Sequence, residues 1–134
     1  MSRIFLFLGA LFGGLSVSMG AFGAHIMRGR YSDYALEIFE KAVRYEMYHA
    51  LALLGTGLLL RWIAREEEGS RALSLIRIAG WLFAAGILFF SGSLTILAFT
   101  GVRWLGAITP VGGVSFVAGW ILLAAGALRL SGKE

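Results

Sequence analysis

Glu46 and His49 are the residues of this sequence whose types and spacing could hold a metal ion. They stand three positions apart, so both side chains lie on one face of a helix, and a second histidine, His25, ends the first apolar segment. Imidazole nitrogens and carboxylate oxygens are zinc ligands, and three such ligands leave the fourth position of the metal open. The two histidines could also bind one haem iron from opposite sides.

Two observations favour a structural role for these residues. Helical bundles that hold two metal ions use two Glu-x-x-His pairs and further glutamates, whereas this chain has one pair and no supporting carboxylate in its apolar segments. Polar groups near a bilayer also need partners, because leaving one unsatisfied is costly. We therefore predict no metal and no cofactor, and expect a polar collar at one membrane face, with the histidines bonded to carbonyls or tyrosine hydroxyls. The collar residues are His25, Tyr45, Glu46, Tyr48 and His49.

The composition is that of an integral membrane protein. Of the 134 residues, 58% are hydrophobic and 15% are charged, against about 45–50% and about 25% in soluble domains. The isoelectric point near 10.0 does not indicate nucleic-acid binding, because the basic residues flank the apolar segments, as membrane insertion requires. The chain has no cysteine, which excludes disulfides, thiolate metal sites and cysteine nucleophiles.

The apolar segments predict four membrane crossings, each of which takes about 20 helical residues. The first resembles a secretory signal after Arg3, but it is longer than the apolar core of a signal peptide, so we expect it to be retained. After it, charged and apolar residues alternate with the helical period, which predicts an amphipathic helix at the membrane interface. We predict a single all-α domain, residues 1–134, forming a four-helix bundle with spans at 4–24, 47–63, 75–99 and 110–128 and the amphipathic helix at 32–45.

Four crossings place both termini on one side of the membrane. That side carries slightly more basic residues, seven against five, which favours the cytoplasm for both termini. The seven are Arg3, Arg61, Arg65, Arg71, Arg77, Arg129 and Lys133, and the five are Arg28, Arg30, Lys41, Arg44 and Arg103.

Small residues recur at steps of three and four along the first and fourth apolar segments. Helices in a bilayer associate by close packing and polar contacts, and small residues let two backbones approach. We expect these stripes to be packing seams in a compact bundle without a wide channel. They comprise Gly9, Gly13, Ser16, Gly20 and Gly23 in the first segment and Gly112, Ser115, Gly119 and Gly126 in the fourth.

We expect a non-catalytic scaffold or accessory subunit whose partners are membrane lipids and another membrane protein or a second copy of the chain. One alternative is a small transporter formed by oligomerisation, in which Ser91, Ser93 and Thr95 line the route, but the predicted spans lack the mid-membrane acidic residue or lysine that transport usually needs. Another is a lipid-binding protein, because arginines beside tyrosines can bind a phosphate headgroup. The candidate headgroup residues are Arg28, Arg30 and Arg44.

Five motifs resemble one known family, and they cover nearly the whole chain. They are Gly20-Ala-Phe-Gly-Ala-His25, Arg44-Tyr-Glu-Met-Tyr-His49-Ala-Leu-Ala-Leu, Ser91-Gly-Ser-Leu94, Leu97-Ala-Phe-Thr-Gly101 and Arg103-Trp-Leu-Gly-Ala-Ile-Thr-Pro-Val-Gly-Gly113. The chain resembles the YgdD/YwdK-like family of small four-span inner-membrane proteins, a domain of unknown function with a mitochondrial transmembrane relative. The resemblance implies a bacterial inner-membrane protein without an established activity or cofactor. His25 and His49 match the family's histidines, whereas the family pattern more often has glutamine at the position of Glu46.

Overall fold

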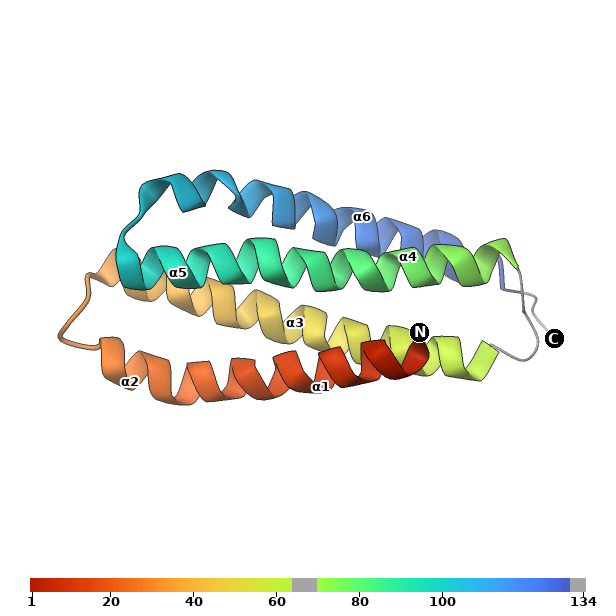
Figure 1. Cartoon of the computed structure of the whole chain (residues 1–134), viewed down its shortest axis with the longest axis horizontal. Coiled ribbons are helices and arrows are strands. Elements are labelled where there is room, and N and C mark those ends of the chain that lie inside the picture. The colour runs from red at the N-terminus through yellow and green to blue at the C-terminus, as the bar shows by residue number, and fades with distance from the viewer. Residues whose placement is uncertain (64–69, 131–134) are drawn as a thin grey trace.

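The computed structural model describes residues 1–63 and 70–130, and this part of the chain forms four helical rods and no strand (Figure 1). The first rod joins α1 (Ser2–Ser18), the π-helical turn η1 (Met19–Gly23) and α2 (Ala24–Met27), and the second is α3 (Asp33–Ile63). The third joins α4 (Arg71–Gly86), the π-helical turn η2 (Ile87–Gly92) and α5 (Ser93–Thr100). The fourth joins the 3-10 helix η3 (Arg103–Ala107) and α6 (Thr109–Ala127).

The rods lie side by side and follow one another up and down the long axis of the molecule (Figure 1). Gly101 ends α5 in the left-handed conformation, with φ +69°, and its N–H donates to the carbonyl of Leu97 at 2.8 Å. The hydroxyl of Ser70 caps the start of α4 by accepting from the N–H of Leu73 at 3.1 Å. A left-handed glycine and a serine cap are usual ways to satisfy the free backbone groups of helix ends.

α3 is one continuous helix where the sequence predicts two elements. The amphipathic segment 32–45 and the second span 47–63 together form a single helix of 31 residues. Neither glycine nor proline stands between Asp33 and Leu54, so nothing in this stretch breaks the helical hydrogen bonding. The predicted interfacial helix is therefore not a separate element, because its residues continue along the axis of the following segment.

Three of the rods are long and apolar enough to cross a membrane, namely Ser2–Met27, Arg71–Thr100 and Arg103–Ala127. α3 is not among them, because charged residues occupy its first half. At about 1.5 Å per residue α3 is nevertheless ~46 Å long, which exceeds the roughly 30 Å of a hydrocarbon core.

Two apolar clusters fill the interior, one toward each end of the rods. The first is built around Phe5, Leu53 and Phe83, and the second around Phe39 and Leu94. Along each of the first three rods, buried polar side chains stand between the positions that belong to the two clusters. We call this set the polar layer, and it comprises Ser16, Glu46, His49, Ser91 and Ser93.

α6 approaches the third rod closely at three glycines. A Cβ atom on Gly112 would lie 2.7 Å from the Cβ and 2.8 Å from the Cα of Phe90, closer than real Cβ contacts allow. The hydroxyl of Ser115 donates across the same seam to the carbonyl of Leu82 at 2.8 Å. Equally tight contacts join Gly119 to Phe83 and Gly126 to Ile76, each with a nearest distance of 2.7 Å.

Tight glycine contacts and one hydrogen bond join the first rod to α3. A Cβ atom on Gly9 would lie 2.8 Å from the carbonyl oxygen of Ala50, and the hydroxyl of Ser16 donates to the carbonyl of Val43 at 2.8 Å. A Cβ atom on Gly23 would overlap the ring of Phe39. Gly13 and Gly20 are looser, since a Cβ atom would have its nearest neighbour at 3.9 Å on Gly13 and at 3.4 Å on Gly20. The closest approaches therefore lie near Gly9, Ser16 and Gly23.

Gly112→Ala should lower the free energy of unfolding by about 1–3 kcal/mol, the usual cost of overpacking, because its methyl group would meet the backbone of Phe90. The neighbouring Gly113→Ala is the matched control, since its nearest contact would be at 3.8 Å. Alanine favours a helix over glycine by about 1 kcal/mol, so the control should be neutral or stabilising. Unfolding curves of both variants in one detergent measure the difference, and equal stabilities would contradict the tight packing.

Candidate functional site

The structure does not gather the predicted polar collar at one membrane face. His49 is buried within α3, whereas His25 is exposed on α2. Gly13 of α1 lies beside Ala50, next to His49, and from there His25 is another 12 residues along the rod, about 18 Å at 1.5 Å per residue. The prediction placed His49 at the start of a helix, but α3 begins at Asp33, so His49 lies four turns inside it.

Both ring nitrogens of His49 have partners inside the protein. Nδ1 lies 2.7 Å from the carbonyl oxygen of Tyr45, and because a carbonyl only accepts, Nδ1 carries the hydrogen. The indole N–H of Trp120 donates to Nε2 at 3.2 Å, which requires a lone pair there. These two contacts assign a neutral imidazole in a single tautomer, and they leave neither nitrogen free for a metal.

An aromatic hollow of about 620 Å³ borders this histidine, and most of its lining comes from α3 and α6. The imidazole of His49 stacks on the ring of Phe116, with centroids 3.4 Å apart and an interplanar angle of 10°. Tyr45, Tyr48 and Trp120 form part of the wall. Three of the predicted collar residues thus meet here, as part of an aromatic cluster.

Glu46 borders a different cavity. This cavity has a volume of about 210 Å³ and lies between the first rod, α3 and the third rod. The residues with polar side chains that line it are Glu46, Ser91 and Thr95. Glu46 is 5% exposed and Ser91 is 2% exposed. The hydroxyl of Ser91 has no hydrogen-bond partner, and among residues 1–63 and 70–130 no ion pair or hydrogen bond engages the Glu46 carboxylate.

The sequence-based interpretation missed this cavity because it placed Glu46 at the membrane interface. Because α3 is continuous, Glu46 instead lines a cavity together with Ser91 and Thr95. In the sequence, these two residues stood out only as polar residues of the third span. The signal that could have found it is the helical period, which runs without interruption from Tyr31 into the apolar half of α3.

A transition-metal site built from histidines and carboxylates has no ligand set in the part of the chain that the structure describes. There, no group of three or more histidine, aspartate or glutamate side chains is placed to hold a metal ion. Glu46 and His49 belong to one turn but border separate cavities, and His25 lies on α2, far along the first rod from both.

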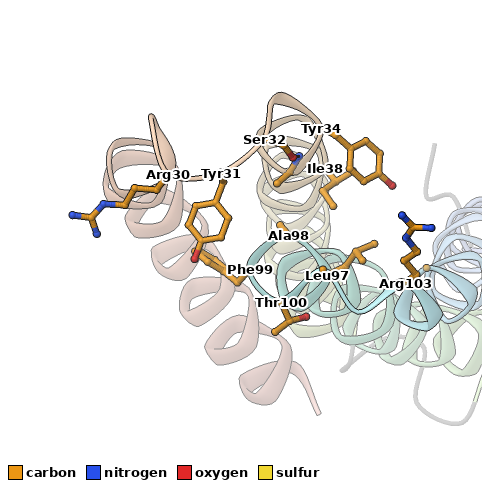
Figure 2. A pocket seen from close by; sticks show the side chains of 13 residues that line it. Arg30, Tyr31, Ser32, Tyr34, Ile38, Leu97, Ala98, Phe99, Thr100 and Arg103 are labelled. Atoms are coloured by element: carbon orange, nitrogen blue, oxygen red, sulfur yellow. The ribbon is translucent and has the colours of Figure 1, made fainter.

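A larger hollow of about 750 Å³ lies where α3 begins and α5 ends. Figure 2 shows Tyr31 and Phe99 on one side of it and Tyr34 with Arg103 on the other, while the side chain of Arg30 extends away. Tyr31 and Phe99 meet edge to face, with centroids 5.6 Å apart. The remaining two candidate headgroup residues lie elsewhere, since Arg28 is exposed outside this hollow and Arg44 borders a separate groove.

Comparison with known proteins finds close relatives over almost the whole chain. The family described as "Protein of unknown function (DUF423)" matches residues 19–113. A UPF0382 membrane protein of Staphylococcus aureus (strain bovine RF122 / ET3-1) is 45% identical over 130 residues, which are 97% of this chain and 99% of the relative. The UPF0382 membrane protein YwdK of Bacillus subtilis (strain 168) is 42% identical over 127 residues, 95% of this chain and 98% of that protein. No solved structure matches the chain.

Proposed function

We propose, from the premise that this chain belongs to the DUF423 family of proteins of unknown function, that it is a non-catalytic scaffold or accessory subunit of the bacterial inner membrane. The similar proteins of Staphylococcus aureus and Bacillus subtilis are named membrane proteins, and three rods of this chain are apolar and long enough to cross a bilayer. The proposal has two parts, a topology and a mode of association.

In the proposed topology the chain crosses the membrane four times, with both termini in the cytoplasm. α3 supports a fourth crossing because it packs against the apolar first rod over most of its length, from Phe39 beside Gly23 to Gly57 beside Leu6. Arg61 marks the cytoplasmic end of this crossing. Arg65 and Lys133, which contribute to the predicted charge bias, lie outside the described residues.

Single cysteines in this cysteine-free chain test the topology. Ser32→Cys and Val102→Cys should react with a membrane-impermeant maleimide on intact cells, because both residues follow outward crossings. Ser2→Cys and Ser70→Cys should react only after permeabilisation. Equal access of the label to Ser32→Cys and Ser70→Cys would contradict a crossing by α3, and the reversed pattern would contradict the orientation.

The outer face of α1 is the observation that carries the scaffold proposal. Ala10, Gly14 and Ser18 are exposed and stand at steps of four, so they form a second small-residue stripe that faces away from α3. A Cβ atom on Gly14 would have no atom within 4 Å. Small residues at this spacing allow another membrane helix to approach closely. The proposed occupant is a helix of another membrane protein or of a second copy of the chain.

Gly14→Leu should abolish this association without disturbing the fold, because the added side chain has free space within the monomer. Gly55→Leu is the matched control, an exposed glycine on α3 that also has open space around it. Chemical crosslinking in native membranes at endogenous expression, followed by mass determination, measures the association. A wild-type protein recovered only as a monomer without a partner would refute the scaffold.

A second candidate function is binding of an anionic lipid headgroup in the hollow beside Tyr34 and Arg103. Arginine pairs well with phosphate oxygens, and tyrosines are common at the membrane interface. The hollow combines both with an apolar floor that includes Ile38 and Leu97. Of the arginines predicted from the sequence, only Arg30 borders this hollow, and its side chain extends away, so Arg103 is the principal candidate to bind a headgroup there.

Combined Arg30→Ala and Arg103→Ala substitutions should reduce the anionic phospholipid that co-purifies with the protein. The matched control combines Arg28→Ala with Arg44→Ala, which removes the same charge from outside the hollow. Lipid mass spectrometry of the detergent-purified proteins gives the amount bound. An equal loss from both double variants would mean general surface attraction rather than a headgroup site.

A further inference from the structure

The cavity that contains Glu46 lacks a positive charge. Its nine lining residues come from three rods, and Glu46 is the one ionisable side chain among them. Arg44 and Lys41, the basic residues nearest in sequence, are exposed and border other surfaces of α3. Glu46 is 5% exposed, and a nearly buried acidic residue is expensive in a membrane protein and marks a functional position by default.

Two residues with hydroxyl groups border the same cavity. The hydroxyl of Ser91 is buried and has no partner in the described part of the chain. Thr95 stands four residues further along the same rod, so both residues lie on one face of it. Glu46, Ser91 and Thr95 are therefore the residues with polar side chains among the nine that line this cavity.

The helices change their winding beside this cavity. η1 contributes Met19 to the lining, and η2 contributes Ser91 and Gly92. π-helical turns are rare and are frequent at functional sites, because the wider turn shifts backbone carbonyls out of the regular ladder. In membrane transporters, carbonyls released where a helix is interrupted coordinate sodium ions. Two such turns from different rods border this cavity.

We propose that the cavity binds one sodium ion, with the carboxylate of Glu46 and the hydroxyls of Ser91 and Thr95 as its side-chain ligands. Hard cations prefer oxygen ligands, and one carboxylate balances one positive charge, so a monovalent ion fits better than a divalent one. The cavity volume of about 210 Å³ leaves room for water to complete the coordination. The inference does not depend on the scaffold proposal, because the residues that line the cavity do not include the outer stripe of α1.

Dicyclohexylcarbodiimide, an apolar reagent that modifies protonated carboxyl groups, tests the site on the purified full-length protein in detergent. Sodium bound to Glu46 displaces the proton and should protect this residue. The rate of modification at Glu46, located by peptide mass spectrometry, should fall about tenfold when sodium is about ten times its Kd. Potassium or choline at the same concentration and pH should protect much less.

Three variants sharpen the measurement. Ser91→Ala should raise the half-protecting sodium concentration about tenfold, the effect expected for loss of one polar ligand. Ser74→Ala is its matched control, because the exposed Ser74 hydroxyl lies outside the cavity and donates to the carbonyl of Ser70 at the start of α4. Glu46→Gln should abolish the modified peptide and identifies the signal.

The wild-type measurement alone decides the proposal, so it does not depend on the folding of a variant. A modification rate at Glu46 that does not change with sodium concentration would mean that the carboxyl group is protonated and binds no sodium. This result would overturn the site. Equal protection by potassium and choline would show an ionic-strength effect and would also overturn it. A Glu46 carboxyl group that is not modified in any of the three salts would overturn the site too, because a group that the reagent cannot reach is also closed to an ion.

Discussion

The requirement that buried polar groups find partners inside the protein governs the middle of this molecule. Along the rods, the polar layer lies between two apolar clusters, and the bilayer offers these groups no water. Ser16 meets the requirement by donating to Val43 of α3, and Ser93 by bonding to the preceding turn and to Thr109. His49 meets it with both ring nitrogens. The hydroxyl of Ser91 has no partner among the described residues, and Ser91 borders the same cavity as Glu46.

Close approach of the helices makes these bonds across the rods possible. A hydroxyl as short as that of serine reaches a carbonyl on another helix only where the backbones are near, as at Ser16 on α1 and Ser115 on α6. Gly9 and Gly112 mark close approaches on the same two seams. Since lipid tails are as apolar as leucine, such contacts replace the hydrophobic effect as the source of association.

The sequence predicts the elements better than their contacts. Apolar runs and helical periods locate all four rods, and the motifs from Gly20 to Gly113 identify the family, which the match to residues 19–113 and the similarity to YwdK confirm. The charged half of α3 suggested an interfacial helix because composition changes near Arg44, but a change of composition does not bend a backbone. Three of the rods are apolar and long enough to cross a membrane. The fourth crossing, by α3, remains a prediction and is part of the proposed topology.

The candidate site shows the same limit at the level of single residues. Spacing correctly places Glu46 and His49 on one helical turn, but it does not reveal which neighbouring rod each side chain meets. His25 was grouped with them from the order of the segments, whereas the register of α1 against α3 separates it from both. The pairing of Glu46 with Ser91 depends on that register too, and so does the bond from Trp120 to His49.

Glu46 and His49 also constrain each other mechanically. They project from one rigid turn of α3 toward flanking cavities, so neither side chain can be displaced by a backbone movement that leaves the other in place. A twist of α3 about its own axis that altered the surroundings of the carboxylate would also strain the bond between the imidazole and Trp120 on α6. A rotation of α3 that changed the surroundings of Glu46 would therefore also change those of His49.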